Sequence, residues 1–126
     1  MENRLAILYT YGVLAGKLSV SRMVDVFSTG PAKFFGLYPQ KGGLLPGRDA
    51  DLIIFDPEYR GRITCENTGL DFTPFEGLQQ SGQPEKVFLC GKLTVSDGKF
   101  IGEKGQGRFI RRAPYGAAYS NRIPER

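Results

Sequence analysis

The sequence predicts an α+β chain in which three helices precede a small set of short strands. Residues 3–15 are apolar nearly all round and are followed by Gly16, a pattern typical of a helix that packs against protein on most of its faces. From residue 37 onward Gly and Pro become frequent and the apolar runs shorten to strand length. The 126 residues, 40% of them hydrophobic, suffice for one ordinary domain with a core.

Two more helices are expected before the change at residue 37. Ser19 is a good N-cap, because its hydroxyl can accept a hydrogen bond from a free backbone N–H of the first turn. One apolar stripe follows at helical spacing and is expected to be buried: Val20, Met23, Val24 and Phe27. Thr29-Gly30-Pro31 opens a third, short helix with Pro in its first turn, and Gly36 ends it.

The strands are expected in two groups. Residues 45–48 form a tight turn centred on Pro46 and Gly47, and they lead into a strand at 52–55 that is buried on both faces and that Pro57 stops. Residues 62–65 are a second, weaker strand. A meander follows at 87–90, 93–96 and 99–101, with its turns at Gly91-Lys92 and at the hairpin dipeptide Asp97-Gly98.

The composition excludes several kinds of active site. The chain has no histidine, so it offers no imidazole ligand for zinc, no Ser-His or Cys-His pair and no near-neutral imidazole base. Three acidic residues flank the strand at 52–55, but they lack the spacing of a calcium loop and are predicted to be turn and strand-end carboxylates: Asp49, Asp51 and Asp56. We therefore predict no catalytic, metal-binding or substrate-binding residue in this chain.

The excess of basic residues lies in the tail. The formal net charge is +4; residues 1–100 are balanced, whereas residues 101–126 hold six basic residues against two acidic ones. A basic arm can bind nucleic acid through its phosphates, but this one lacks a recognised reading motif. We expect no nucleic-acid partner and favour an arm that is solvated or that contacts another subunit. The expected contact residues are Arg108, Phe109, Ile110, Arg111, Arg112 and Tyr115.

The two cysteines and the hydropathy pattern bear on the compartment. Cys65 and Cys90 are far apart in the sequence, and buried free thiols are favoured over a disulfide, which indicates a reducing compartment. No leader-like segment opens the chain, and its aliphatic runs are far shorter than the ~18 residues that span a bilayer. We expect a cytoplasmic protein with no membrane partner.

Several motifs occur together in one order along the chain, and as a set they resemble the C-terminal region of dihydropyrimidinases and D-hydantoinases. One departure is Gly30, where this family would be expected to carry Asn. The most informative motifs are Ser28-Thr29-Gly30-Pro31-Ala32-Lys33, Phe35-Gly36-Leu37-Tyr38-Pro39, Asp49-Ala50-Asp51-Leu52, Asp71-Phe72-Thr73-Pro74-Phe75-Glu76-Gly77 and Gly105-Gln106-Gly107-Arg108-Phe109-Ile110.

The resemblance implies a larger enzyme, built from a (β/α)8 amidohydrolase barrel and a β-sandwich assembled from both ends of the chain. The present sequence would then be an α+β fragment of it. Residues 1–36 would be the terminal helices of the barrel, residues 37–101 the C-terminal portion of the β-sandwich, and residues 102–126 a basic tail used in subunit contacts. An apolar helix at 3–15 in so short a chain is explained if the rest of the barrel covers it.

The resemblance also implies a function for the complete protein. Such enzymes open dihydropyrimidines or 5-substituted hydantoins by hydrolysing a ring C–N bond, with two zinc ions whose ligands and catalytic aspartate all precede this region. The chain alone would be catalytically incomplete and would need the missing N-terminal barrel portion or a homologous subunit, and the full-length form would be a homo-oligomer. The alternative is a non-catalytic, dihydropyrimidinase-related module for interaction or assembly.

Overall fold

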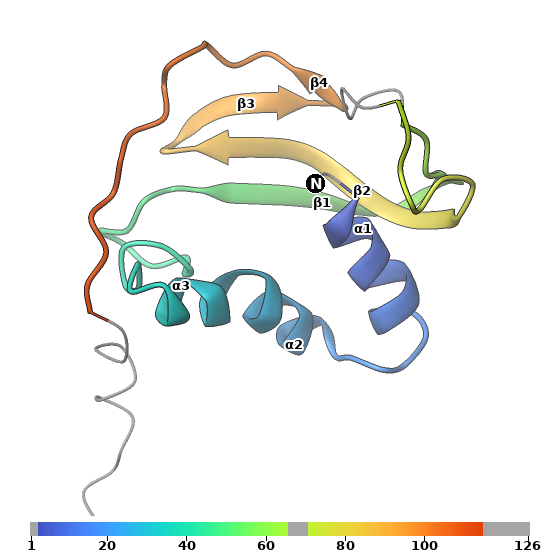
Figure 1. Ribbon diagram of the computed structural model, residues 1–126, viewed down its shortest axis with the longest axis horizontal. Coiled ribbons are helices and arrows are strands. Elements are labelled where there is room, and N and C mark those ends of the chain that lie inside the picture. The colour runs from blue at the N-terminus through green and yellow to red at the C-terminus, as the bar shows by residue number, and fades with distance from the viewer. Residues whose placement is uncertain (1–2, 66–70, 115–126) are drawn as a thin grey trace, which may run out of the picture.

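The computed structural model describes residues 3–65 and 71–114 as two helical runs followed by a four-stranded antiparallel sheet (Figure 1). The first run is α1 (Arg4–Leu8) and a π-helical segment (Tyr9–Val13). The second is α2 (Val20–Val24), a π-helical segment (Asp25–Thr29) and α3 (Gly30–Phe34). None of the described helices is both long and apolar enough to cross a membrane.

The predicted helix ends are confirmed at Gly16 and Ser19. Gly16 has a φ of +70°, a conformation that glycine adopts without a steric penalty. The hydroxyl of Ser19 accepts a hydrogen bond from the backbone N–H of Arg22 at 3.1 Å, as an N-cap should. Both signals depend on local backbone geometry, which explains why the sequence reveals them.

The third helix is confirmed as α3 with Pro31 in its first turn, but it is not separated from the second, because α2 continues through the π-helical segment directly into α3. Pro31 has no N–H to donate, and the turn before it is widened so that the Gly30 N–H donates to the Asp25 carbonyl five residues earlier. A Cβ at position 30 would lie only 2.9 Å from that carbonyl oxygen. The wider turn therefore carries the helix past a proline that was expected to begin a new one.

The sheet has the order β1-β2-β3-β4 and is a simple meander. Its strands are β1 (Leu52–Arg62), β2 (Gln79–Leu89), β3 (Lys92–Ser96) and β4 (Lys99–Phe100). The predicted turn at Asp97-Gly98 is confirmed, with φ of +51° and +75°. The other turn is centred on Cys90-Gly91, not on Gly91-Lys92, because Lys92 pairs with Leu89 and the two positive φ values fall at residues 90 and 91.

The prediction that Pro57 stops the first strand is wrong. β1 runs on to Arg62, and the ladder with β2 is interrupted between Asp56 and Arg60, so that Pro57 lies where no ladder hydrogen bond is required of it. The separate strand expected at 62–65 is absent from the described residues. Ile63 instead exchanges backbone hydrogen bonds with Gly77 and Leu78, 2.9 and 3.0 Å long, which tie together the two ends of the loop between β1 and β2.

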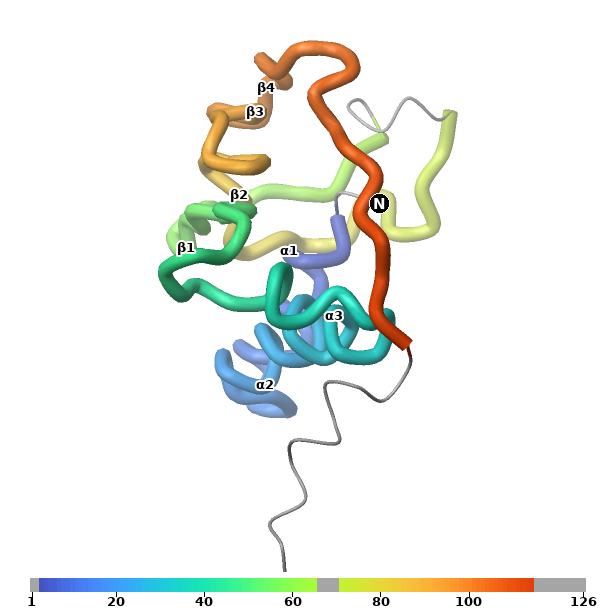
Figure 2. The backbone as a smooth tube through the Cα atoms, turned by 90° about the vertical axis from the view of Figure 1, so that its left-hand side faces the viewer, coloured from blue at the N-terminus to red at the C-terminus, as the bar shows by residue number. Residues whose placement is uncertain are grey.

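The first helical run is fixed to the sheet by two hydroxyls and two rings. The hydroxyl of Tyr11 donates to the Gln79 carbonyl at 3.1 Å. Thr10 Oγ1 accepts from the Ser81 N–H at 2.9 Å and lies 2.7 Å from the Ala6 carbonyl to which it donates. The rings of Tyr9 and Phe55 meet edge to face with centroids 5.0 Å apart. The views in Figures 1 and 2 show the helices gathered on the β1 side of the molecule, away from β3 and β4.

Much of the expected core is exposed. Of the predicted stripe on the second run only Met23 is buried, while Val20 and Val24 are 55% and 49% exposed and Phe27 is half-buried. Ile53 and Ile54 are also exposed, so the prediction of a strand buried on both faces is wrong for the chain by itself. In the part of the chain that the structure describes, the buried apolar side chains are Ala6, Met23, Ala32 and Ile63.

Candidate functional site

The described residues offer no place for a metal ion. No group of three or more His, Cys, Asp or Glu side chains within residues 3–65 and 71–114 could hold one. The whole chain, moreover, lacks the imidazole that a His-rich zinc centre requires. The residues of this chain therefore do not fit the two-zinc centre that the resemblance implies for the complete enzyme.

The structure does bring together charged residues that the sequence left apart. Lys41, in the loop after α3, forms ion pairs with Asp49, at 2.9 Å, and with Asp51. Gln40 Nε2 donates to Asp49 at 3.2 Å, and Asp51 accepts from the Cys90 N–H at 2.8 Å. This group of Lys41, Asp49 and Asp51, here called the charge cluster, links the loop before β1 to the turn between β2 and β3.

The side chains of Asp49 and Lys41 are largely covered, at 13% and 17% exposed. The hydrogen bond from Lys41 lowers the pKa of Asp49; burial opposes this shift, and Arg108 adds to it. Burial alone would lower the pKa of Lys41, but the hydrogen bonds and charges of Asp51 and Asp49 outweigh it and raise that pKa above 10.5. Both shifts favour the charged, paired forms near neutral pH.

The tail reaches this cluster. Arg108 donates from a guanidinium nitrogen to Asp49 Oδ1 at 2.8 Å, although the two residues are 59 positions apart. Further along, the Ala113 N–H donates to the Gly36 carbonyl at 2.8 Å, just past the end of α3. The tail therefore lies against the body of its own chain as far as residue 113.

The six residues expected to contact another subunit have different surroundings. Arg108 pairs within the chain, Phe109 is 90% exposed, and Ile110 is half-buried. Arg111 and Arg112 are exposed, and Tyr115 lies outside the described residues. Contact with another subunit stays a prediction for these side chains.

The sequence-based interpretation of the three carboxylates as structural is consistent with their hydrogen bonds. Asp56 accepts from the Glu58 N–H at 2.8 Å, within the interrupted part of β1. The spacing of Asp49 and Asp51, two residues apart in an extended segment, was the available signal that both could meet one cation. The sequence pattern does not identify Lys41 or Arg108 as that cation. Both residues reach the aspartates only because of the paths that the loops take in the folded chain.

The pH dependence of the cluster follows from these shifts. Asp49 has a folded pKa below the ordinary 3.8, so its ion pairs contribute fully above that value and are lost as the pH falls through the lowered folded pKa. We expect the urea midpoint to fall on acidification below about pH 4. Asp49→Asn, which has no charge to lose, should show a smaller fall over the same range by circular dichroism. Equal falls in the two proteins would contradict a stabilising charge at Asp49.

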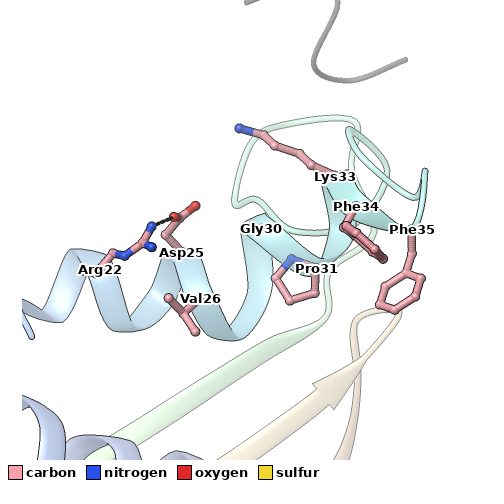
Figure 3. Close-up of a pocket in the computed structure, with 8 residues that line it drawn as sticks. All are labelled: Arg22, Asp25, Val26, Gly30, Pro31, Lys33, Phe34 and Phe35. Atoms are coloured by element: carbon pink, nitrogen blue, oxygen red, sulfur yellow. Dashed lines mark hydrogen bonds and ion pairs between the residues drawn. The ribbon is translucent and has the colours of Figure 1, made fainter. Parts of the chain in front are cut away.

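A second feature is an open pocket of about 520 Å³ along the second helical run (Figure 3). The ion pair between Arg22 and Asp25, 2.6 Å long, lies at one end of it, and the rings of Phe34 and Phe35 meet at the other. The two charged groups satisfy each other, so they do not converge on a small ligand. The lining residues are Arg22, Asp25, Val26, Gly30, Pro31, Lys33, Phe34 and Phe35.

The fold and these residues match a known class of proteins. The family model described as "Amidohydrolase family" matches residues 2–98. The chain therefore belongs to the amidohydrolase family.

Within that family its relatives are hydantoinases. The D-hydantoinase of Geobacillus stearothermophilus is 42% identical over 119 residues, which are 93% of this chain and 25% of the relative. The D-phenylhydantoinase of Escherichia coli is 39% identical over 91% of this chain and 25% of its own length. The chain thus spans about a quarter of the length of the curated relatives it matches.

Solved structures agree with the sequence relatives. The D-hydantoinase (dihydropyrimidinase) from Thermus sp. superposes with a TM-score of 0.86 at 47% identity, over 90% of this chain and 25% of that one. The L-hydantoinase (dihydropyrimidinase) from Arthrobacter aurescens gives 0.81 at 36% identity, over 86% and 24%. The resemblance to the hydantoinase and dihydropyrimidinase branch is confirmed.

Proposed function

We propose that this chain is the C-terminal portion of a hydantoinase- or dihydropyrimidinase-like enzyme that opens cyclic amides by hydrolysing a ring C–N bond. One observation carries the proposal: about nine-tenths of the chain matches a quarter of such enzymes in both sequence and fold. The helices to residue 36 are the last helices of the barrel, residues 37–101 belong to the β-sandwich, and residues 102–126 are the tail.

By itself the chain is catalytically incomplete. The imidazole ligands of the two zinc ions belong to the other three-quarters of the enzyme, because this chain has no histidine. The family resemblance implies that the catalytic aspartate lies there too. This chain's own contribution is structural. The helices present apolar side chains that the rest of a barrel would cover, among them Leu14, Val20, Val24, Val26, Phe34 and Phe35, which are 42–55% exposed.

The proposal is tested with a chimera. The matching quarter of the Geobacillus stearothermophilus D-hydantoinase is replaced by this chain, and ring opening of a 5-substituted hydantoin and of dihydrouracil is assayed. We expect turnover of at least one substrate within about tenfold of the parent enzyme, corresponding to a barrier change of roughly 1.4 kcal/mol. The 126-residue chain alone should neither turn over substrate nor retain zinc, by metal analysis.

Controls separate the two candidate functions. A parent enzyme with the quarter deleted should be inactive, which shows that activity in the chimera depends on the inserted chain. Turnover by the 126 residues alone would contradict incompleteness. A folded chimera that holds metal but is inactive would contradict a hydrolase origin and support the alternative, a non-catalytic module for interaction or assembly.

The tail is proposed to contact a neighbouring subunit of a homo-oligomer. Phe109 supports this, because an aromatic side chain 90% exposed beside arginines is typical of an interface anchor. In the chimera, Phe109→Ala should lower the oligomeric state measured by sedimentation, while the metal content per subunit stays the same. Lys104→Ala, a second exposed residue of the tail, is the matched control and should leave assembly unchanged. Full assembly of the Phe109 variant would contradict the contact.

The compartment is proposed to be the cytoplasm. No disulfide joins Cys65 and Cys90, which fits a reducing environment. The expectation that they are buried is wrong, because Cys90 is exposed at the turn between β2 and β3 and Cys65 is only half-buried.

A further inference from the structure

Residues 103–114 form a strap that leaves the sheet after β4 and runs back along the molecule to the end of α3, as Figures 1 and 2 both show. The strap makes polar contacts with the body at two points, residues 108 and 113, which are five residues apart in the sequence. One is the ion pair of Arg108 with Asp49, and the other is the hydrogen bond from Ala113 to Gly36. Neither point involves a hydrogen bond of the sheet.

At the first point Asp49, which accepts the hydrogen bond from Arg108, is held in place by residues outside the strap. Asp49 is held by Lys41 and Gln40 without help from the strap, and its side chain is 13% exposed. The charge cluster holds two negative charges and one positive charge, so it carries a net charge of −1 that the guanidinium of Arg108 neutralises. Arg108 is itself 60% exposed, so it is the half of the pair that can leave.

Departure of Arg108 would leave the cluster with its net charge of −1, but each carboxylate would still have a partner. Asp49 keeps its ion pair with Lys41, and Asp51 keeps both Lys41 and the Cys90 N–H. A buried charge without any partner is what makes breaking most covered ion pairs costly, and that cost is reduced here. The first point is therefore easy to open, and salt should weaken it because half of the pair faces solvent.

The contact at the second point requires a residue without a side chain at position 36. Gly36 follows α3 with a φ of +68°, and its carbonyl accepts the Ala113 N–H at 2.8 Å. A Cβ at position 36 would overlap the Ala113 carbonyl oxygen. Gly36 is thus required twice, for the backbone turn and for the close approach of the strap.

We propose that the strap is a latch with one charge-operated point, Arg108 on the charge cluster, and one shape-dependent point, Ala113 on Gly36. While the latch is closed, the strap is held against the body and Phe109 stands outward between the two points. When Arg108 leaves, the hydrogen bond from Ala113 to Gly36 is the remaining polar contact between residues 103–114 and the body, so this segment opens more often. The latch is independent of the proposed enzymatic function, since it uses contacts within this chain only.

Limited trypsin digestion of the full chain tests the latch, because Arg111 lies between the two points and its peptide bond is a trypsin site. When reclosing is fast, the cleavage rate follows the population of the open form. Arg108→Gln should speed the cut after Arg111 by about threefold to tenfold, the range expected for loss of one partly exposed charged hydrogen bond. Raising NaCl from about 0.05 M to about 0.5 M should speed this cut in the original chain and not in the variant.

Two matched controls isolate the contacts. Lys104→Gln removes an exposed positive charge of the same strap away from the scissile bond and should leave the rate within about twofold. Gly16→Ala introduces the same strain as Gly36→Ala, since both glycines end helices with φ near +70°, but a Cβ at 16 meets nothing within 4 Å. Gly36→Ala should therefore speed the cut after Arg111 more than Gly16→Ala does.

Cleavage after Lys17, in the loop between the helical runs, serves as the internal reference for general loosening. Exchange of the Ala113 amide proton gives a second measurement, and it should be faster in Arg108→Gln. If Arg108→Gln and Lys104→Gln are cut after Arg111 at the same rate, or if salt acts equally on the original chain and on Arg108→Gln, the latch is wrong.

Discussion

Purified alone, the 126-residue chain is expected to bind a hydrophobic dye strongly and to self-associate at micromolar concentration. The physical reason is the small buried core beside many exposed apolar side chains, five of which lie on or next to the second helical run: Val20, Val24, Val26, Phe34 and Phe35. Exposed apolar area of that kind is removed from water by association when its proper cover is absent. Dye fluorescence and sedimentation velocity measure the two effects.

A double variant locates the surface responsible. Val20 and Val24 lie one turn apart on α2 and are each about half exposed, so Val20→Gln with Val24→Gln removes apolar area without touching the buried Met23. We expect the association constant to fall about tenfold, which corresponds to about 1.4 kcal/mol. Ser21→Gln, at an exposed polar position of the same helix, is the control and should change nothing. A compact monomer that melts cooperatively and binds no dye would contradict the expectation.

Gly82→Ala is expected to destabilise the chain more than substitution of a glycine in an open turn. Gly82 lies on β2 with a φ of +75°, and a Cβ there would come within 2.5 Å of the Phe55 ring and 3.0 Å of the Tyr9 ring. These rings fasten the first helical run to the sheet. Backbone strain and overpacking together should cost about 3 kcal/mol of unfolding free energy.

Gly98→Ala is the matched control for backbone strain. Gly98 has the same φ of +75°, but a Cβ there meets nothing within 4 Å, so only the strain remains and the cost should be about 1 kcal/mol. Urea midpoints are compared by circular dichroism at one protein concentration, because self-association shifts apparent stability. Equal midpoints for the two variants would show that the packing of Tyr9 and Phe55 around Gly82 contributes little.

Much of the local structure could be predicted from the sequence because it depends on backbone preferences of single residues. Ser19 caps α2, and Gly16 ends the first helical run with a positive φ. The turn at 45–48 is also confirmed, with Gly47 at +83° and a 3.2 Å hydrogen bond from Arg48 to Leu45. Such signals act over a few residues, so no tertiary context is needed to read them.

Burial could not be predicted in the same way. Val20, Val24 and Ile53 have the pattern of a core, but whether an apolar face is buried depends on what covers it, and the matched relatives are about four times as long as this chain. Pro57 also needed tertiary context. A proline usually stops a strand, but Pro57 lies where the ladder of an edge strand is interrupted, so no backbone N–H is required at that position.

The composition alone determined one functional point, since a chain without histidine cannot supply the imidazole ligands of a zinc hydrolase. The charge cluster was decided only by the tertiary structure. Asp49 and Arg108 are 59 residues apart, and their ion pair exists because the meander and the strap return the chain to the loop before β1. Charge attraction acts over a few ångströms in space whatever the separation in sequence, so a pattern read along the chain predicts a basic tail but not its partner.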